Sequence, residues 1–366
     1  MSAESGAPVI EATGLKQRFG DRTVLDVESL AVAPREVLGV LGPSGSGKSV
    51  LLRALNLLEP PSQGTIRFNG EEIQGLAGRS RVEVSRRMAM VFQDPLLFRG
   101  VVRDNVAYGL KVRRVPADER ERRVREALAV VGLTDRAGSN VATLSGGEAQ
   151  RVAVARALVI EPEVLLFDEP FANLDAPARR SLQDETKSIL DERRMTAVFV
   201  THDQEEAARM ADHIMVMHDG RIAQEGTARD LFYKPENKFV ARFMGVENIY
   251  DGRVVGFEDG IAEVSVEGAV VQAVAETAVG AQVTLGVRPE DVTLVPAEEI
   301  TARASSRNAL VGKVVHVELR GPLARVSMEV PFPLVAFVTR RTAEEMGIEV
   351  GAEFGARFKA TAVAVM

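Results

Sequence analysis

Short runs of consecutive apolar residues alternate with helix-like segments along the chain up to residue 244. A run of four or five apolar residues between turn signals is typical of a strand that is buried on both faces. Because such strands alternate with helical segments, the pattern predicts a doubly wound α/β core. The predicted strands are 37–41, 164–167, 196–200 and 214–217, and the predicted helices are 50–55, 152–158, 203–210 and 228–232.

Beyond Met244 the pattern changes to short alternating strands separated by glycine-containing turns. The stretches beginning at Gly252 and Gly312 both read Gly, a basic residue, Val, Val, and each opens such a region. This weak internal repeat predicts two small β-barrels of the OB type at 246–298 and 304–366. The segment 296–305 is the predicted linker, and the α/β core is expected to occupy 1–240.

Eight residues between the strand 37–41 and its helix form a complete phosphate-binding loop. The glycines let successive backbone N–H groups curl around phosphate oxygens, and the helix N-terminus adds partial positive charge. In such a loop the lysine reaches the β- and γ-phosphates and the final hydroxyl ligates Mg²⁺. The loop consists of Gly42, Pro43, Ser44, Gly45, Ser46, Gly47, Lys48 and Ser49.

Two carboxylates, Asp168 and Glu169, end the apolar run that begins at Val164. Ligands of an open parallel sheet bind at the carboxyl ends of its strands, so these acids are predicted to lie beside the phosphate loop. Asp168 is expected to hold Mg²⁺ through a water, and Glu169 to orient and polarise the attacking water. The competing interpretation is a strand ending in an acidic surface pair, which a phosphate loop in the same chain disfavours.

A second anion-binding pattern, Ser145-Gly146-Gly147-Glu148, precedes the helix predicted at 152–158. A serine with two glycines at a helix start is suited to capping an anion. One chain has no evident use for two such sites, so the second is expected to cap the nucleotide of another copy. On these motifs the sequence resembles the ATPase subunit of an ABC transporter. The resemblance implies a head-to-tail dimer that sandwiches two ATP molecules.

The other elements of that family follow in order. Gln93 resembles the Q-loop glutamine, which senses Mg²⁺ and the attacking water. Residues 173–175 resemble the D-loop at the dimer interface, and His202 resembles the switch histidine that contacts the γ-phosphate. Phe19 stands where the family has an aromatic residue that stacks on adenine.

The resemblance implies an active ATPase in which Glu169, His202 and Gln93 act in hydrolysis. Phe19 replaces the commoner tyrosine and keeps the ring face. Glu148 replaces the glutamine of the signature, as in many importer subunits. Neither departure removes a group that the chemistry needs.

The resemblance also implies a helical subdomain at about 94–158. Its segment 111–125 interleaves arginines with acids, which is typical of the solvated face of a helix. The preceding 95–110 is apolar for a connecting region, and the family receives a short helix of a separate membrane permease here. The competing interpretation is that these residues only pack the subdomain.

The first predicted barrel resembles the accessory barrel of importer ATPases. The second, through its segments 306–308, 312–314, 335–339, 342–347 and 359–363, resembles the fold of small molybdate-storage proteins and the tail of molybdate-importer ATPases. Fixed N–H and hydroxyl donors with modest charge suit a tetrahedral oxyanion. We expect molybdate or tungstate bound here to hold the dimer open and inhibit uptake; alternatively, this lobe only dimerises. The candidate donors are Ser306, Arg307, Asn308, Lys359 and Thr361.

Composition and charge narrow the chemistry, the partners and the cellular location that can be expected of this protein. The 366 residues include no cysteine, so disulfides and thiolate metal sites are excluded. The net charge of −7 argues against broad nucleic-acid binding. Residues 1–8 lack a signal-peptide pattern, and no apolar stretch approaches the roughly 20 residues that span a bilayer. A peripheral position on the cytoplasmic face of the plasma (inner) membrane is therefore expected, with a separate permease and, indirectly, a solute-binding protein as partners.

Three alternatives stay open. The first is an importer ATPase for sulfate, a polyamine, a sugar or iron, with a purely structural C-terminal region. The second is a non-transport ABC ATPase acting on DNA or ribosomes, for which a long coiled coil or tandem ATPase halves would be expected. The third is an oxyanion buffer with a silent ATPase, which the presence of Glu169 and His202 disfavours.

Overall fold

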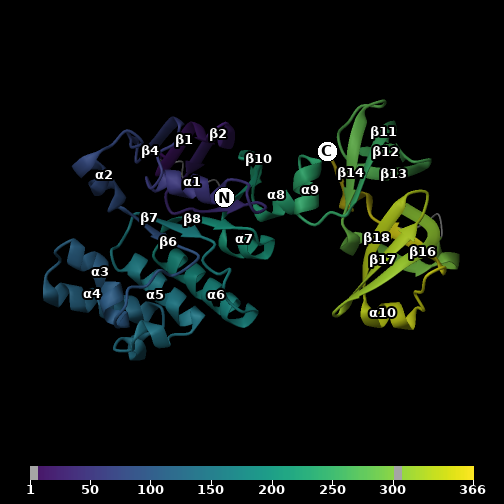
Figure 1. The fold of residues 1–366 in the computed structure, drawn as a ribbon. Helices are drawn as coiled ribbons and strands as arrows, with labels where there is room; N and C mark the ends of the chain where they lie inside the picture. The colour runs from purple at the N-terminus through teal and green to yellow at the C-terminus, as the bar shows by residue number, and fades with distance from the viewer. Residues whose placement is uncertain (1–6, 301–306) are drawn as a thin grey trace. The chain divides into compact units, whose positions relative to one another are not determined.

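The computed structural model describes residues 7–300 and 307–366, which form two compact units that divide between Ala228 and Arg229 (Figure 1). The first unit is the α/β core and the second is built mainly of strands, so the predicted fold class is confirmed. The first unit ends before the expected boundary at 240. Within the described ranges, no helix combines the length and the apolar character that crossing a bilayer requires.

The central sheet of the first unit has six strands in the order β10-β9-β3-β8-β7-β6. The five strands from β9 to β6 in this order run parallel to one another, and only the edge strand β10 is antiparallel to its neighbour. All five parallel strands therefore present their carboxyl ends at one edge of the sheet. The strands are β3 (Val37–Leu41), β6 (Met88–Val91), β7 (Val164–Asp168), β8 (Thr196–Thr201), β9 (His213–His218) and β10 (Arg221–Gly226).

Both faces of this sheet are covered, as the unbroken apolar runs predicted. In β7, Val164 and Leu166 enter one hydrophobic core while Leu165 and Phe167 enter the other, because successive side chains of a strand point to opposite faces. One core lies against an antiparallel sheet of order β2-β1-β4-β5 and helix α1. These elements are β1 (Ile10–Phe19), β2 (Arg22–Val32), β4 (Gln63–Phe68), β5 (Glu71–Glu72) and α1 (Lys48–Leu55).

The other core lies against helices, three of which lie within residues 94–158, where a helical subdomain is expected. α3 packs on α4 and α5, and α5 also packs on β6 and α6 (Figure 1). The helices of the unit are α2 (Gly78–Ser85), α3 (Val102–Val112), α4 (Ala117–Val130), α5 (Gly146–Leu158), α6 (Ala176–Glu192) and α7 (Gln204–Met210), with 3₁₀ turns η1 (Thr134–Arg136) and η2 (Val141–Thr143).

The second unit contains two five-stranded antiparallel sheets that share one hydrophobic core. Their strand orders are β13-β12-β11-β14-β20 and β15-β19-β16-β17-β18. Helix α8 (Ala228–Tyr233) begins at the boundary and α9 (Lys238–Phe243) follows it. The strands are β11 (Asn248–Glu258), β12 (Ile261–Val266), β13 (Ala269–Val274), β14 (Gln282–Val287), β15 (Thr293–Pro296), β16 (Asn308–Arg320), β17 (Leu323–Glu329), β18 (Pro333–Thr339), β19 (Glu353–Phe358) and β20 (Val363–Val365).

The internal repeat is visible in these two sheets, but they exchange their last strands. β15 follows the strands of the first sheet and pairs with β19 of the second, whereas β20 ends the chain and pairs with β14 of the first. The expected lobes 246–298 and 304–366 therefore do not coincide with the strand pairing. The remaining elements are the 3₁₀ turns η3 (Pro289–Asp291), η4 (Ala297–Glu299) and η5 (Ala360–Ala362) and the helix α10 (Arg340–Glu345).

Candidate functional site

The phosphate-binding loop connects β3 to α1 at the carboxyl edge of the central sheet. Gly47 has φ +100°, and a Cβ there would lie 2.7 Å from the Val24 carbonyl oxygen. A Cβ at Gly42 would lie 2.4 Å from the Met217 carbonyl oxygen. Backbone therefore crowds the loop at these two positions, and only glycine fits both.

Lys48 places its ammonium group inside this loop. Its side chain is buried, with 4% exposed, and Nζ donates hydrogen bonds to the carbonyl oxygens of Gly42 (2.8 Å) and Pro43 (3.0 Å). Burial lowers the pKa of Lys48, while the carboxylates of Glu169 and Asp168 act in the opposite direction. The cation is thus held at the loop and faces two acids.

A buried hydroxyl in the same loop fits a phosphate ligand. Ser46 is buried, and within the described ranges its Oγ has no hydrogen-bond partner. Its backbone is fixed, because its carbonyl accepts from Gly220 N at 3.0 Å and its N–H donates to Pro43 O at 3.2 Å. A hydroxyl on this fixed backbone, in the same loop as a buried ammonium group, is a suitable donor for a phosphate oxygen.

Ser49 and Asp168 meet across the loop. The Ser49 hydroxyl donates a 2.8 Å hydrogen bond to Asp168 Oδ1, although the two residues are 119 positions apart in the chain. Burial raises the pKa of Asp168, and the hydrogen bond from Ser49 offsets part of that rise. No cluster of three or more His, Asp or Glu side chains suited to a metal occurs in the described part of the chain. One carboxylate and one hydroxyl fit Mg²⁺, which takes its other ligands from water and substrate phosphates.

Glu169 and His202 form a second pair at this edge. Glu169 has φ +47°, and its N–H donates to the Val200 carbonyl of the neighbouring strand β8 at 3.0 Å. The turn directs its side chain toward His202, whose Nδ1 lies 2.9 Å from Glu169 Oε2. His202 directly follows β8, and its ring is more than half exposed. The pair thus presents a carboxylate and an imidazole to solvent beside Asp168.

Gln93 lies two residues beyond β6, and its side chain is exposed. The loop that carries it is held at both sides. Asn173 Nδ2 donates to Asp94 Oδ1 at 3.0 Å, and the buried Gln150 of α5 donates through Nε2 to Phe92 O at 3.1 Å. The segment resembling the Q-loop is therefore joined directly to the segment resembling the D-loop and to α5.

Phe19 ends β1 at the tip of the hairpin with β2, where it pairs with Arg22. Its ring is exposed. Val24 is two residues further along β2, and its carbonyl backs onto Gly47. The hairpin tip therefore lies near the phosphate loop with an aromatic face available for stacking.

The signature residues begin α5. Ser145 caps this helix, with its Oγ accepting from Glu148 N at 3.3 Å, while Ser145 N donates to Glu148 Oε2 at 2.9 Å. Glu148 also forms a 3.0 Å ion pair with Arg136, and the Ser145 N–H, helped by Arg136, holds the pKa of Glu148 below its usual value. Glu148 thus acts in the cap, and its contact with nucleotide stays a prediction, as do those of Ser145, Gly146 and Gly147.

The C-terminal oxyanion candidates lie at one end of the β16–β19 ladder, except Ser306, which is outside the described residues. Asn308 pairs with Phe358 in this ladder, so Arg307 and Lys359 extend from the same end. Arg307, Lys359 and Thr361 are exposed. Asn308 differs because it is buried and binds the backbone of β13, accepting from Gln272 N at 2.7 Å and donating to Gln272 O at 2.9 Å.

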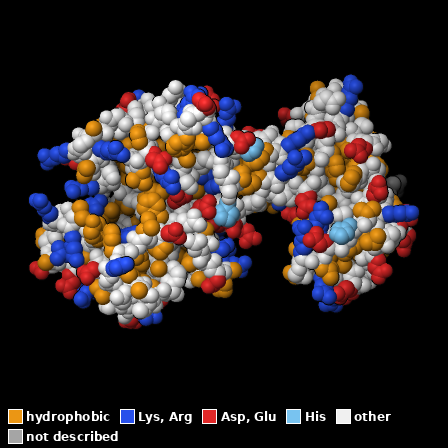
Figure 2. Space-filling model, in the orientation of Figure 1, with side chains coloured by type: hydrophobic (Ala, Val, Ile, Leu, Met, Phe, Trp, Pro, Cys, Tyr) orange, Lys and Arg blue, Asp and Glu red, His pale blue; other side chains and the backbone are white. Residues whose placement is uncertain are grey.

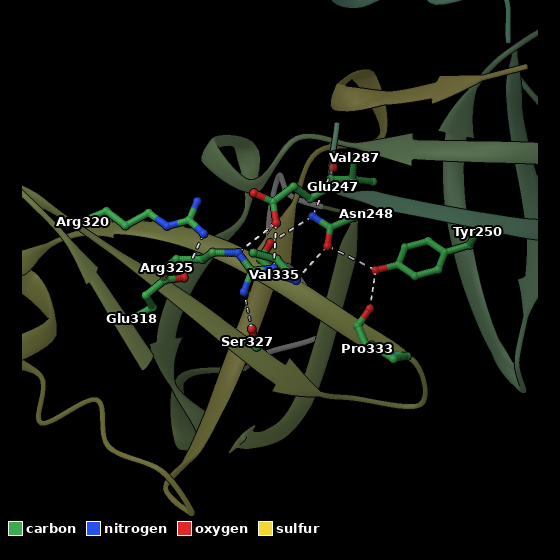
Figure 3. Close-up of polar contacts among 10 residues, drawn as sticks. All are labelled: Glu247, Asn248, Tyr250, Val287, Glu318, Arg320, Arg325, Ser327, Pro333 and Val335. Carbon is green, nitrogen blue, oxygen red and sulfur yellow. Dashed lines mark hydrogen bonds and ion pairs between the residues drawn. The ribbon is translucent and has the colours of Figure 1, made fainter. Parts of the chain in front are cut away.

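The internal repeat contains a second asparagine that makes the same backbone hydrogen bonds as Asn308. Asn248 occupies the matching position in β11 and binds Val335 of β18 in the same way, at 2.7 Å and 2.9 Å (Figure 3). Tyr250 lies beside Asn248, and its hydroxyl donates to Pro333 O at 2.5 Å (Figure 3). Each asparagine therefore joins one sheet to the edge of the other. Sequence reasoning did not single out Asn248, although the 60-residue offset from Asn308 matches that between Gly252 and Gly312.

The matching ends of the two sheets differ in charge. At the positions of Arg307 and Lys359, the first sheet has Glu247 and Arg288. Glu247 is paired with Arg325 at 2.7 Å (Figure 3), and Arg288 with Glu290 at 2.9 Å. The first end thus carries one acid and one base, each in an ion pair, whereas the second presents two basic side chains and a hydroxyl.

Two family models match the chain. The model described as ABC transporter matches residues 25–172, and the model described as TOBE domain matches residues 304–365. The first range contains the phosphate loop and the Asp168–Glu169 pair. The second begins close to the start of the second predicted lobe.

Three curated import ATP-binding proteins are similar over most of the chain. The molybdate/tungstate import ATP-binding protein WtpC of Pyrococcus horikoshii is 40% identical over 328 residues, covering 89% of this chain and 91% of the relative. The Fe(3+) ions import ATP-binding protein FbpC of Streptomyces coelicolor is 40% identical over 349 residues, covering 95% of each. The spermidine/putrescine import ATP-binding protein PotA of Oleidesulfovibrio alaskensis is 41% identical over 290 residues, covering 78% and 76%.

Two solved structures share the α/β core. CbiO1 of Clostridium perfringens, part of the ABC transporter complex cbiONQ, has a TM-score of 0.58 at 30% identity and covers 65% of this chain and 94% of that one. The dimeric, post-hydrolysis ATP-binding cassette MJ0796, bound to ADP and Pi, has a TM-score of 0.55 at 28% identity and covers 60% and 99%. With the phosphate loop, the carboxylate pair and the histidine at one sheet edge, this chain belongs to the ATP-binding subunits of ABC importers and is an ATPase.

Proposed function

We propose that two copies of this chain close head to tail over two ATP molecules and drive import of a solute through a separate membrane permease. The observation that carries the proposal is the convergence of Lys48, Ser49, Asp168, Glu169 and His202 at one edge of the central sheet. Ser145 and its two glycines lie at the N-terminus of α5, where the partial positive charge of a helix favours an anion. The dimeric state of MJ0796 supports the pairing of two copies.

In the proposed mechanism, Lys48 and the loop N–H groups bind the β- and γ-phosphates. Ser49, Asp168 and Gln93 would hold Mg²⁺, which supplies charge neutralisation of the phosphate oxygens when bound. Glu169 accepts a proton from the attacking water. His202, whose ring is oriented by its 2.9 Å contact with Glu169, contacts the γ-phosphate.

The position of Glu169 gives the direct test. Glu169→Gln keeps the size of the side chain but removes its basicity, so ATP binding should persist while kcat falls by about 10²–10⁴-fold. Titration with a fluorescent ATP analogue and phosphate release measure the two effects. Glu225→Gln, an exposed acid on β10, is the control and should retain normal turnover. Near-normal hydrolysis in Glu169→Gln would remove Glu169 from the role of base.

We propose that the permease docks on the helical subdomain. A surface cavity of about 490 Å³ opens there, and the exposed rings of Phe98 and Tyr108 are nearby in the sequence. Figure 2 shows hydrophobic side chains gathered on this unit between the β1–β4 region and the α3–α4 region. An apolar groove of this kind accepts a short helix. The cavity is lined by Pro95, Leu97, Arg99, Gly100, Asn140, Val141, Ala142 and Ala149.

A charged residue introduced into this cavity tests docking separately from ATP hydrolysis. Leu97→Glu should leave ATP hydrolysis by the isolated chain within about twofold and abolish co-purification with the membrane subunit when both are co-expressed. Glu83→Gln, an exposed acid on α2, serves as the surface control. Retained co-purification of Leu97→Glu would place the docking surface elsewhere. Because this partner is a membrane protein, the chain is proposed to lie at the cytoplasmic face of the plasma membrane.

For the solute we propose molybdate or tungstate, with the C-terminal end of the second unit as a sensor. Arg307, Lys359 and Thr361 supply charge and a hydroxyl, and WtpC is a molybdate/tungstate import protein. The Fe(3+) and spermidine/putrescine import proteins are also similar to this chain, so another solute is the second candidate. Isothermal titration of the full chain with molybdate, tungstate and sulfate should give binding of the first two. Lys359→Gln should weaken it at least tenfold, and equal heats for all three anions would discard the sensor.

A further inference from the structure

A buried carboxyl group lies next to the turn that carries His202, and neither ATP binding nor Mg²⁺ binding uses it. Glu206 of α7 is 6% exposed. Its Oε2 accepts a 2.5 Å hydrogen bond from the hydroxyl of Thr201. Glutamate is rarely buried to this degree unless its carboxyl group has a partner. The residue that it contacts directly precedes His202.

Thr201 uses its hydroxyl in both directions. It donates its proton to Glu206 and accepts a 3.0 Å hydrogen bond from the N–H of Asp203. Asp203 in turn caps α7 by accepting from Glu206 N at 3.1 Å. These bonds form a closed ring that spans His202 on both sides. The backbone of His202 is therefore fixed between the end of β8 and the start of α7.

Arg179 of α6 extends this network to the segment resembling the D-loop. Its Nη2 donates to Leu174 O at 2.9 Å, and its Nη1 lies 3.9 Å from Asp203 Oδ2. The ring around His202 is thus joined to a segment that is expected to face the second copy.

We propose that Glu206 is a positioning residue for ATP hydrolysis: its carboxyl group accepts a hydrogen bond from the Thr201 hydroxyl and fixes the turn that presents His202 to Glu169 and the nucleotide. The inference rests on the proposed role of His202 in hydrolysis. Oε2 can accept from Thr201 in either protonation state, because a protonated carboxyl group keeps a carbonyl oxygen that accepts. Removal of the carboxyl group would take away one of the two bonds that span His202.

The charge state of Glu206 changes in an accessible pH range. Burial raises the pKa of Glu206 to about 7, with repulsion from Asp203 in the same direction, while the Thr201 hydrogen bond and Arg179 oppose the rise. The buried amide of Gln183 on α6 is the neutral neighbour. The other titratable groups at the turn are His202 and Glu169. The carboxylate therefore dominates above about pH 7 and the carboxylic acid below it, and an oxygen that can accept from Thr201 is present in both.

The test is steady-state ATP hydrolysis by the full chain between pH 5.5 and 9. For the wild type, titration of Glu206 should impose no step of its own on kcat near pH 7, because Thr201 keeps its acceptor in both protonation states. Glu206→Ala, which has no acceptor, should lower kcat by about 10- to 100-fold with KM for ATP unchanged, because a displaced catalytic group affects turnover more than binding. Glu206→Gln keeps an amide oxygen that accepts from Thr201, so it should restore most of the turnover at each pH. Glu205→Gln, an exposed acid on the same helix, should behave as the wild type.

Two further variants keep the inference falsifiable. Thr201→Val is nearly isosteric and should lower kcat as Glu206→Ala does, and the double variant should lose no more than either single one. If His202→Ala lowers kcat but the Thr201 and Glu206 variants do not, the positioning role is refuted while the proposed function stands. If His202→Ala has no effect, the role of His202 fails and that of Glu206 with it. A Glu206→Gln variant as slow as Glu206→Ala also refutes the proposal.

Discussion

Asn308 offers a quantitative test of how the second unit is held together. Asn308→Ala removes two hydrogen bonds, of 2.7 Å and 2.9 Å, and leaves the N–H and C=O of Gln272 without these partners. An unmade hydrogen bond to a buried group costs about 1–3 kcal/mol. Gln272 is half-buried, so water can replace part of the loss. The two bonds together should therefore contribute about 2–3 kcal/mol to the closing of β13 on its neighbour.

Hydrogen exchange followed by mass spectrometry measures this closing locally. A loss of about 2–3 kcal/mol corresponds to roughly 30- to 150-fold faster exchange, since 1.4 kcal/mol is tenfold in an equilibrium constant. The faster exchange should appear in the peptide covering β13. Asn248→Ala is the matched control, because the repeat predicts the same acceleration in β18 instead.

An opposite pattern would refute this reasoning. If Asn308→Ala left exchange in β13 within twofold of the wild type, the two hydrogen bonds would not hold the sheets together. If the same variant also lost molybdate binding, Asn308 would be a ligand, as the sequence resemblance implied, and not a structural residue.

Three further outcomes are expected. Gly47→Ala should abolish binding of a fluorescent ATP analogue, because the new Cβ would lie 2.7 Å from Val24 O at a φ of +100°; tight binding would contradict the loop geometry. Ser145→Ala should lower the thermal stability of the chain by about 1 kcal/mol through loss of the helix cap, as followed by circular dichroism, and an unchanged melting temperature would count against it. The pKa of Glu206 rises from 4.5 to about 7 on folding, so the wild type should lose on the order of 2–3 kcal/mol as pH rises through this window. Glu206→Gln should not lose it in urea denaturation, and parallel curves would refute the assignment.

The catalytic edge of the first unit was predictable because its motifs are chemically constrained. A phosphate loop needs glycines where backbone crowds it, as at Gly42 and Gly47. The strand before Asp168 reads as a continuous apolar run because both of its faces are buried. Parallel strands bring their carboxyl ends together, so the contact between Ser49 and Asp168 followed from the topology.

The network around Glu206 and the position of Gln150 could not be predicted in this way. Both are polar residues in helices that read as ordinary amphipathic segments, and burial depends on what packs over them. Arg179 contacts Leu174 and Asp203 through tertiary structure that no local pattern encodes. The partner of Glu148 is likewise distant, since Arg136 belongs to a separate 3₁₀ turn.

The exchange of strands in the second unit could not be predicted from the sequence either. β15 has only four residues and ends at Pro296, so it reads as the start of a linker. β15 and β20 follow equivalent 3₁₀ turns in the two halves of the repeat. Their composition therefore does not indicate which sheet each joins. The choice is made by long-range pairing, with Pro296 opposite Phe354 and Val363 opposite Val287.

This exchange has a consequence for biosynthesis. The outer edge of the β11 sheet is supplied by Val363–Val365, which pair with β14. Until residues 363–365 have left the ribosome, β14 lacks a neighbour on one side, so the first sheet cannot be completed in the order in which its strands are synthesised. Substitutions in 363–365 would therefore harm a sheet whose other strands lie some seventy or more residues earlier in the chain.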